Sequence, residues 1–118
     1  MSLIRTNGAN RRVTVILRTM GEDQRRQPVP VEVARVPCAG RWVAATDGDV
    51  ERYGESGGAV MDLARFITGS FPGDDLSQVL TEDGRVWEVQ GGVTRHNPSR
   101  MTRRDTVVLS AKAQTRRW

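Results

Sequence analysis

Residues 78–89 read QVLTEDGRVWEV and carry the clearest β-hairpin signal in the chain. At the centre of this segment lie Glu82, Asp83 and Gly84, residue types that favour tight turns for backbone reasons. The turn separates a short first run from the alternating run 85–89, in which valine and tryptophan stand beside charged residues. The segment therefore predicts two antiparallel strands joined by a tight turn.

Other segments also have the composition of strands. Residues 12–18 (RVTVILR) are β-branched and are followed by a polar run that is typical of a loop. Residues 31–45 contain several valines, but Pro37 and Gly40 interrupt them, so this segment predicts either two short strands or one bent strand. A last strand is expected at residues 106–112.

Residues 59–68 (AVMDLARFIT) are ambiguous, because their apolar positions fit both a helical stripe and the alternation of a strand. Both interpretations stay open for this segment. The chain as a whole predicts an all-β fold, a small antiparallel β-barrel or sandwich of about six strands with long loops and little helix.

Two segments are expected to be long loops. Residues 46–58 are rich in Gly, Asp and Glu, and residues 91–105 are basic and contain the only histidine, His96. At 118 residues the chain predicts one domain, with a flexible amino-terminal arm of about residues 1–11 and a carboxy-terminal tail of about residues 113–118.

The composition argues against several kinds of chemistry. One cysteine, Cys38, and one histidine leave no basis for a disulfide framework or a zinc site, so no metal is expected. No sequence feature places a base beside a nucleophile, and the glycines match no phosphate-binding fingerprint. We therefore expect no enzyme activity and no cofactor. The chain also lacks the roughly 18 to 20 apolar residues in a row that cross a bilayer, so no membrane contact is expected.

Charge is distributed unevenly along the chain, whose formal net charge is +4. Residues 47–90 carry three arginines against ten acidic residues, whereas residues 91–118 carry seven basic residues against one acid. An acidic middle and a basic end are consistent with contacts between one copy and another, or with solvent-facing loops that differ by chance.

Several short motifs occur in a recognisable order. Residues 83–91 read DGRVWEVQG, and Asn-Pro at 97–98 and a final strand at 106–110 follow them. Residues 36–39 (VPCA) end an earlier strand, and residues 72–75 (PGDD) form a turn. This order resembles the head-to-tail connector proteins of long-tailed bacteriophages, the stopper or head-completion group. One departure is Arg95-His96, since the family often has a tryptophan before its Asn-Pro.

The resemblance implies a structural virion protein of the phage neck, present in the host cytoplasm during assembly. It implies a compact β-barrel in a homo-oligomeric ring, with a dodecamer favoured over a hexamer, below the portal and adaptor proteins. Such a ring closes the DNA channel after packaging and presents the surface to which the tail docks. Genomic DNA would pass through the channel without specific binding.

Candidate site residues follow from the resemblance and the charge map together. An acidic loop in the channel would repel DNA phosphates, and arginines at the basic end would dock on acidic faces of a neighbouring ring or of the tail. The expected channel residues are Asp47, Asp49, Glu51, Arg52, Tyr53 and Glu55. The expected docking residues are Arg95, Arg100, Arg103, Arg104, Arg116 and Arg117.

Two alternatives remain open at this point. A small basic β-barrel that binds nucleic acid would use Trp42, Tyr53 and Trp87 as stacking platforms for bases. Another neck or tail component, such as a tail terminator, would share the virion setting but would be expected to contain more helix.

Overall fold

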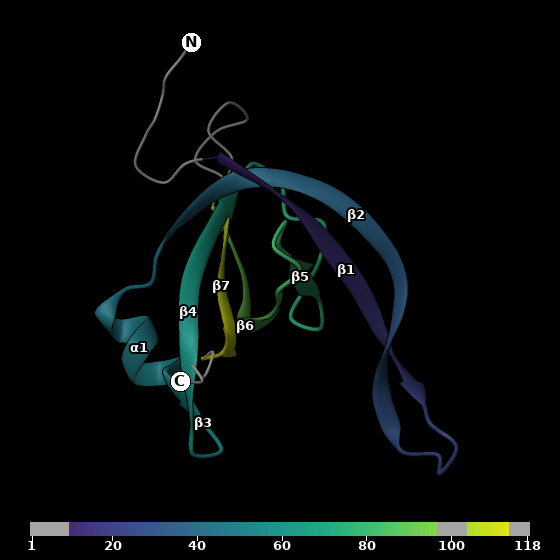
Figure 1. Cartoon of the computed structure of the whole chain (residues 1–118). Helices are drawn as coiled ribbons and strands as arrows, with labels where there is room; N and C mark the ends of the chain where they lie inside the picture. Colours follow the sequence, from purple (N-terminus) through teal and green to yellow (C-terminus); the bar gives the residue numbers. More distant parts are fainter. Residues whose placement is uncertain (1–9, 97–103, 114–118) are drawn as a thin grey trace.

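The computed structural model describes residues 10–96 and 104–113, and Figure 1 shows how the elements within these ranges are arranged. The elements are β1 (Asn10–Glu22), β2 (Pro28–Ala44), α1 (Asp47–Tyr53), β3 (Glu55–Ser56), β4 (Ala59–Thr68), β5 (Gln78–Leu80), β6 (Val86–His96) and β7 (Arg104–Lys112).

Six of the strands form a closed antiparallel barrel. The hydrogen-bonded order is β2, β1, β5, β6, β7 and β4, and pairing between β2 and β4 closes the circle. The short strand β3 pairs with β4 outside the circle. Because the circle closes, each barrel strand pairs with one neighbour on either side, and the paired residues form no free sheet edge. The all-β antiparallel fold with little helix predicted from the sequence is confirmed, and of the two forms left open, barrel and sandwich, the structure is the barrel.

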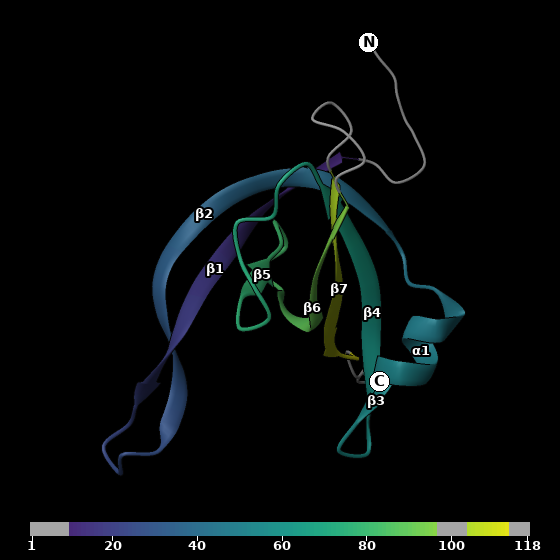
Figure 2. The same cartoon turned by 180° about the vertical axis from the view of Figure 1, so that it is seen from behind.

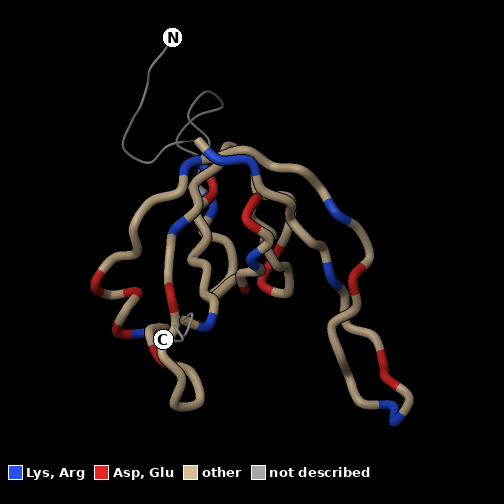
Figure 3. Tube along the Cα trace, viewed as in Figure 1, with Lys and Arg blue, Asp and Glu red and all other residues tan. Residues whose placement is uncertain are grey.

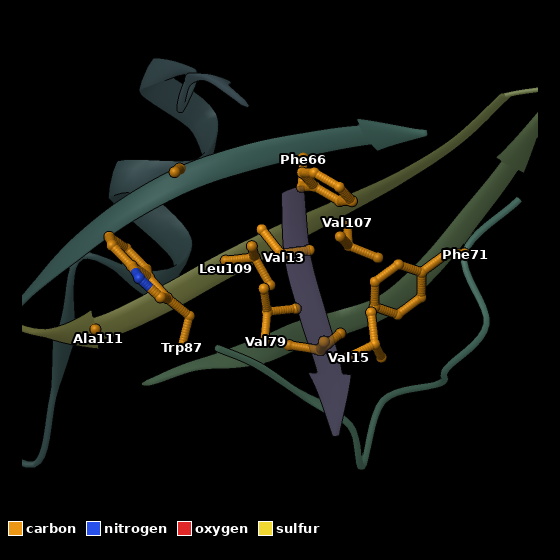
Figure 4. Close-up of a cluster of buried hydrophobic side chains, with 11 residues drawn as sticks. Val13, Val15, Phe66, Phe71, Val79, Trp87, Val107, Leu109 and Ala111 are labelled. Carbon is orange, nitrogen blue, oxygen red and sulfur yellow. The ribbon is translucent and has the colours of Figure 1, made fainter. Parts of the chain in front are cut away.

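The core lies inside the barrel and follows the alternation of the strands (Figure 4). Side chains one residue apart point to opposite faces, so every second residue of a barrel strand enters the core. Phe71 reaches the same cluster from the loop after β4. The buried apolar members are Val13, Val15, Ala64, Phe66, Phe71, Val79, Trp87, Val89, Val107, Leu109 and Ala111.

The predicted hairpin at residues 78–89 is present. Val79 pairs with Trp87, and the Thr81 amide donates to the Arg85 carbonyl at 3.0 Å. Gly84 supplies the turn with a φ of 87°, a conformation that costs glycine little.

The two open questions about strands are also resolved. Residues 59–68 form strand β4, in which Ala64, Phe66 and Thr68 are buried at every second position. The valine-rich segment is one bent strand, β2. Gly40 lies at its close approach to β4, because a β-carbon there would be 2.7 Å from Cζ of Phe66.

The prediction of a long loop at residues 46–58 is wrong, because this segment forms helix α1 and strand β3. A capping box starts the helix. The Asp49 amide donates to Oγ1 of Thr46 at 3.2 Å, and the Thr46 amide donates to Oδ2 of Asp49 at 3.0 Å. These two bonds satisfy amides that a free helix end would leave unpaired.

The prediction of a second long loop at residues 91–105 is wrong for residues 91–96 and 104–105, the part of it that the structure describes. Strand β6 continues to His96, and β7 already begins at Arg104. Gly91 and Gly92, with φ values of 71° and 79°, form a bulge where the register between β6 and β7 shifts. The Asn-Pro motif at 97–98 lies outside the described residues, as do most of the expected terminal arm and tail.

Strands β1 and β2 extend far beyond the barrel as a two-stranded hairpin (Figures 1 and 2). Strand β5 pairs with β1 only over Thr14–Ile16, so residues 18–22 of β1 pair with β2 alone. Arg18 ties the base of the hairpin to the barrel, since its guanidinium donates to the Leu76 carbonyl at 2.6 Å and to Glu88 at 2.9 Å. We call residues 19–33 the β1–β2 arm.

Candidate functional site

The expected channel residues gather around helix α1, but they do so in different roles. Asp47, Glu51 and Arg52 are exposed on the helix, and Glu55 is exposed on β3. Asp49 is buried, and Tyr53 is half-buried. The structure therefore brings these six residues into one region, although only part of them face solvent.

Asp49 fastens helix α1 to the barrel. Nε of Arg65, on β4, donates to Oδ2 of Asp49 at 2.6 Å, and Nη2 of the same arginine donates to Oδ1 at 3.0 Å. The Arg65 hydrogen bonds lower the pKa of Asp49 to about 2, although burial of the carboxylate opposes this shift. The carboxylate is thus ionised at neutral pH and has its oxygens occupied, so it acts as a structural anchor.

A polar pocket of about 330 Å³ lies beside this ion pair, between α1 and the outer faces of β4, β6 and β7. The glycine bulge forms part of its wall, and the Tyr53 hydroxyl sits so close to Gly91 that a β-carbon there would be 2.4 Å from it. The full lining is Asp49, Arg52, Tyr53, Arg65, Gln90, Gly91, Gly92, Thr94, Thr106 and Val108.

The chemistry of the pocket is limited by these side chains. Its one carboxylate is already paired, and it contains neither a thiol nor an imidazole. Within residues 10–96 and 104–113, no group of three or more His, Cys, Asp or Glu side chains is placed to hold a metal ion. What these side chains do in the structure is hold α1 against β4 through the Asp49–Arg65 pair.

The docking arginines are only partly described. Arg95 forms an ion pair with the fully buried Asp105, with Nη1 2.7 Å from Oδ2, and the Phe71 amide donates to the same oxygen at 2.7 Å. Arg95 thus holds the loop after β4 against β6 and β7. Arg104 is exposed at the start of β7. Arg100, Arg103, Arg116 and Arg117 lie outside the described residues.

Two of the three aromatic residues considered as base-stacking platforms, Trp42 and Trp87, are engaged by other residues, whereas Tyr53 is half-buried. Trp87 is buried, and Trp42 packs against it edge-on with ring centroids 5.0 Å apart. Arg11 covers Trp42 at 5.3 Å, and Arg85 covers Trp87 at 4.6 Å. These contacts stabilise the barrel and occupy ring faces that a base would need.

Sequence reasoning missed the β1–β2 arm as a surface. Met20, Val31 and Val33 are large apolar residues that remain exposed on it. The valines at 29, 31 and 33 alternate like those of an ordinary barrel strand, so composition alone does not separate them from core positions.

No family model matches the chain, and no curated protein matches it in sequence. Among the described residues, no helix is long and apolar enough to cross a membrane.

Proposed function

We propose that the protein is a structural subunit of the neck of a long-tailed bacteriophage. In this role it forms a homo-oligomeric ring below the portal and adaptor proteins, closes the DNA channel after packaging and presents the surface to which the tail docks. The observation that carries the proposal is the β1–β2 arm, a long ordered projection whose strands pair only with each other beyond Ile16 and on which Met20, Val31 and Val33 are exposed.

An arm of this kind fits an assembly protein better than an isolated binding module. Exposed apolar side chains on a projecting hairpin are costly in water unless a partner covers them. Rings of identical subunits supply such a partner at every position. The order of motifs shared with connector proteins then narrows the assembly to the phage neck.

Two features weigh against the alternatives. A nucleic-acid barrel needs free aromatic faces, whereas Trp42 and Trp87 pack into the barrel with arginines over their rings. A tail terminator was expected to contain more helix, whereas the described residues contain a single short helix, α1.

Helix α1 also bears on how the proposed ring closes its channel. The segment that carries the expected channel residues is fixed to β4 by the Asp49–Arg65 pair. We therefore assign closure of the channel to the ring as a whole, without giving α1 the role of a moving gate.

Electron microscopy tests the proposal directly. The purified protein should form rings with a central opening, of twelve-fold or six-fold symmetry. An antibody raised against it should label the junction of head and tail in virions of the phage that encodes it. Labelling of the capsid or the tail tip instead of the neck would overturn the assignment.

A further inference from the structure

The β1–β2 arm presents apolar side chains that stay exposed within the described part of the chain. Val31 and Val33 are 43% and 61% exposed. Val31 lies over Gly21 of the same hairpin, where a β-carbon would lie 2.8 Å from its Cγ2. At the base, Arg18 holds the hairpin to the barrel, so the arm has a set direction in which to meet a partner.

The tip of the arm is charged. Arg25 and Arg26 are exposed, and their guanidinium groups form no ion pair among the described residues. Of the two acids beside them, Asp23 accepts hydrogen bonds from the amides of Arg25 and Gln27 and so serves the turn. Glu22 is exposed and is the one neighbouring carboxylate left without such a role.

The opposite side of the molecule carries complementary features. Figures 1 and 2 place α1 and β3 on the side away from the arm, and Figure 3 shows acidic residues along this region. Val50 on α1 and Val60 at the start of β4 are exposed, Val60 by 66%. Asp47, Glu51 and Glu55 are exposed and form no ion pair within the described part of the chain. We call these five residues the α1–β3 corner.

We propose that the β1–β2 arm of one subunit docks on the α1–β3 corner of the next copy of this chain. Valines of the arm would cover valines of the corner, and Arg25 and Arg26 would face the unpaired carboxylates. Because arm and corner lie on opposite sides of one molecule, the contact is head-to-tail, and such contacts generate a ring when the rotation closes. This interface rests on the ring of the proposed function and gives it a physical basis.

The interface assigns a new role to the acidic corner. Its carboxylates face the basic tip of a neighbour instead of the channel axis. Each exposed ion pair contributes little alone, so covering the valines must contribute most of the affinity. The charges then select the correct partner surface and orientation.

Complementary variants can test the contact. The arm variant combines Val31→Asp with Arg25→Glu, and the corner variant combines Val50→Lys with Glu51→Arg. Each has one damaged surface and one intact surface. Val86→Asp is the matched control, because Val86 is exposed by 42%, nearly as much as Val31, but belongs to neither surface. Circular dichroism should show that all variants keep the β-sheet signal of the wild type.

Sedimentation velocity then gives a distinctive pattern. The wild type and the control should form the same oligomer, whereas each variant alone should bind itself at least about tenfold more weakly. A mixture of the two variants should regain association, because the intact arm of the corner variant can meet the intact corner of the arm variant, and the reversed charges on the two damaged surfaces are again opposite in sign.

Other results would overturn the interface. An arm variant or a corner variant that keeps the wild-type oligomer excludes it, and so does a mixture that remains monomeric. A wild type that is monomeric even at about 1 mM also excludes it, because the contact would be too weak to build a ring. Neck labelling by electron microscopy is measured separately, so the proposed function can survive the loss of this particular interface.

Discussion

Asp49 shows how one side chain sets the position of a whole helix. Its carboxylate caps the first turn of α1 and also pairs with Arg65 on the barrel. The pKa of Asp49 falls from 3.8 to about 2 in the folded protein. A folded-state pKa below the unfolded one adds stability that is present above pH 3.8 and is lost as the pH falls toward 2.

Replacing this carboxylate should therefore destabilise the protein at neutral pH. We expect Asp49→Asn to lower the free energy of unfolding by about 1 to 2 kcal/mol at pH 7. The loss should shrink below pH 4, because the unfolded chain then takes up a proton on Asp49 that the folded protein does not bind until the pH nears 2. Denaturant unfolding at pH 7 and pH 3 measures both effects. Asp47→Asn is the control, since Asp47 is exposed on the same helix, and an equal loss in this variant would contradict the anchor role.

Gly91 tests the packing of Tyr53 against the β6 bulge. Gly91 and Gly92 both have positive φ, but only at Gly91 would a β-carbon meet the Tyr53 hydroxyl. Gly92→Ala should cost about 1 kcal/mol of unfolding free energy from backbone strain alone. Gly91→Ala should cost more, because Tyr53 must also move.

Removing the hydroxyl should separate the two costs. In the double variant Gly91→Ala with Tyr53→Phe, the extra loss relative to Gly92→Ala should largely disappear, because the atom that the methyl group meets is gone. Thermal unfolding of the four variants, including Tyr53→Phe alone, provides this comparison. If Gly91→Ala and Gly92→Ala lose the same stability, the contact with Tyr53 is not limiting.

At the scale of elements, local signals were predictable and long-range ones were not. The turn at Gly84 needs only neighbouring residues, and its hairpin followed from the sequence. Helix α1 was not predicted. Its capping box lies within the four residues from Thr46 to Asp49, but the Gly and Asp residues in this segment are equally typical of a loop. Closure of the barrel depends on the pairing of Trp42 with Phe66, 24 positions apart in the sequence, which no periodicity reveals.

In the candidate site, too, local groupings of residues could be predicted from the sequence, whereas contacts between distant strands could not. Charge grouping in the sequence placed Asp47, Glu51 and Glu55 in one region, and they do lie together around α1 and β3. The partners of Asp49 and Arg95 come from distant strands, so their structural roles needed the fold. The arm was missed because exposure of Val31 depends on where its neighbouring strands end.

The arm should also behave as a separate element in hydrogen exchange. Its strands pair only with each other beyond Ile16, so the arm amides open without disturbing the barrel. In the monomeric arm variant, amides of residues 19–22 should exchange at least about 100-fold faster than those of Val13 and Val15. In the assembled wild type, the difference in exchange rate between the arm and the barrel should be smaller, because a neighbouring subunit covers the hairpin. Equal protection in the monomer would show that the arm is as stable as the barrel.

At the scale of the whole molecule, the proposed ring and a nucleic-acid barrel differ in how tightly they should bind DNA. A channel must let the genome pass, so its contacts with phosphates must be weak. A dedicated binding barrel would instead stack bases on aromatic residues, with about 1 to 3 kcal/mol lost for each ring removed. Here Trp42 contacts Phe66 and Trp87, so its removal should weaken the fold and not a DNA complex.

We therefore expect only weak, sequence-independent binding of DNA that disappears as salt rises, since the net charge of +4 attracts phosphates while Trp42 and Trp87 are occupied by contacts within the barrel. Fluorescence titration with single- and double-stranded DNA across a range of salt concentrations measures this. Tyr53→Ala tests the half-buried ring beside Gly91, and Arg104→Ala, at an exposed position, tests the phosphate contribution. Submicromolar binding of single-stranded DNA at physiological salt, weakened by Tyr53→Ala in a folded variant, would favour the nucleic-acid barrel, because a ring that holds DNA so tightly would block its passage.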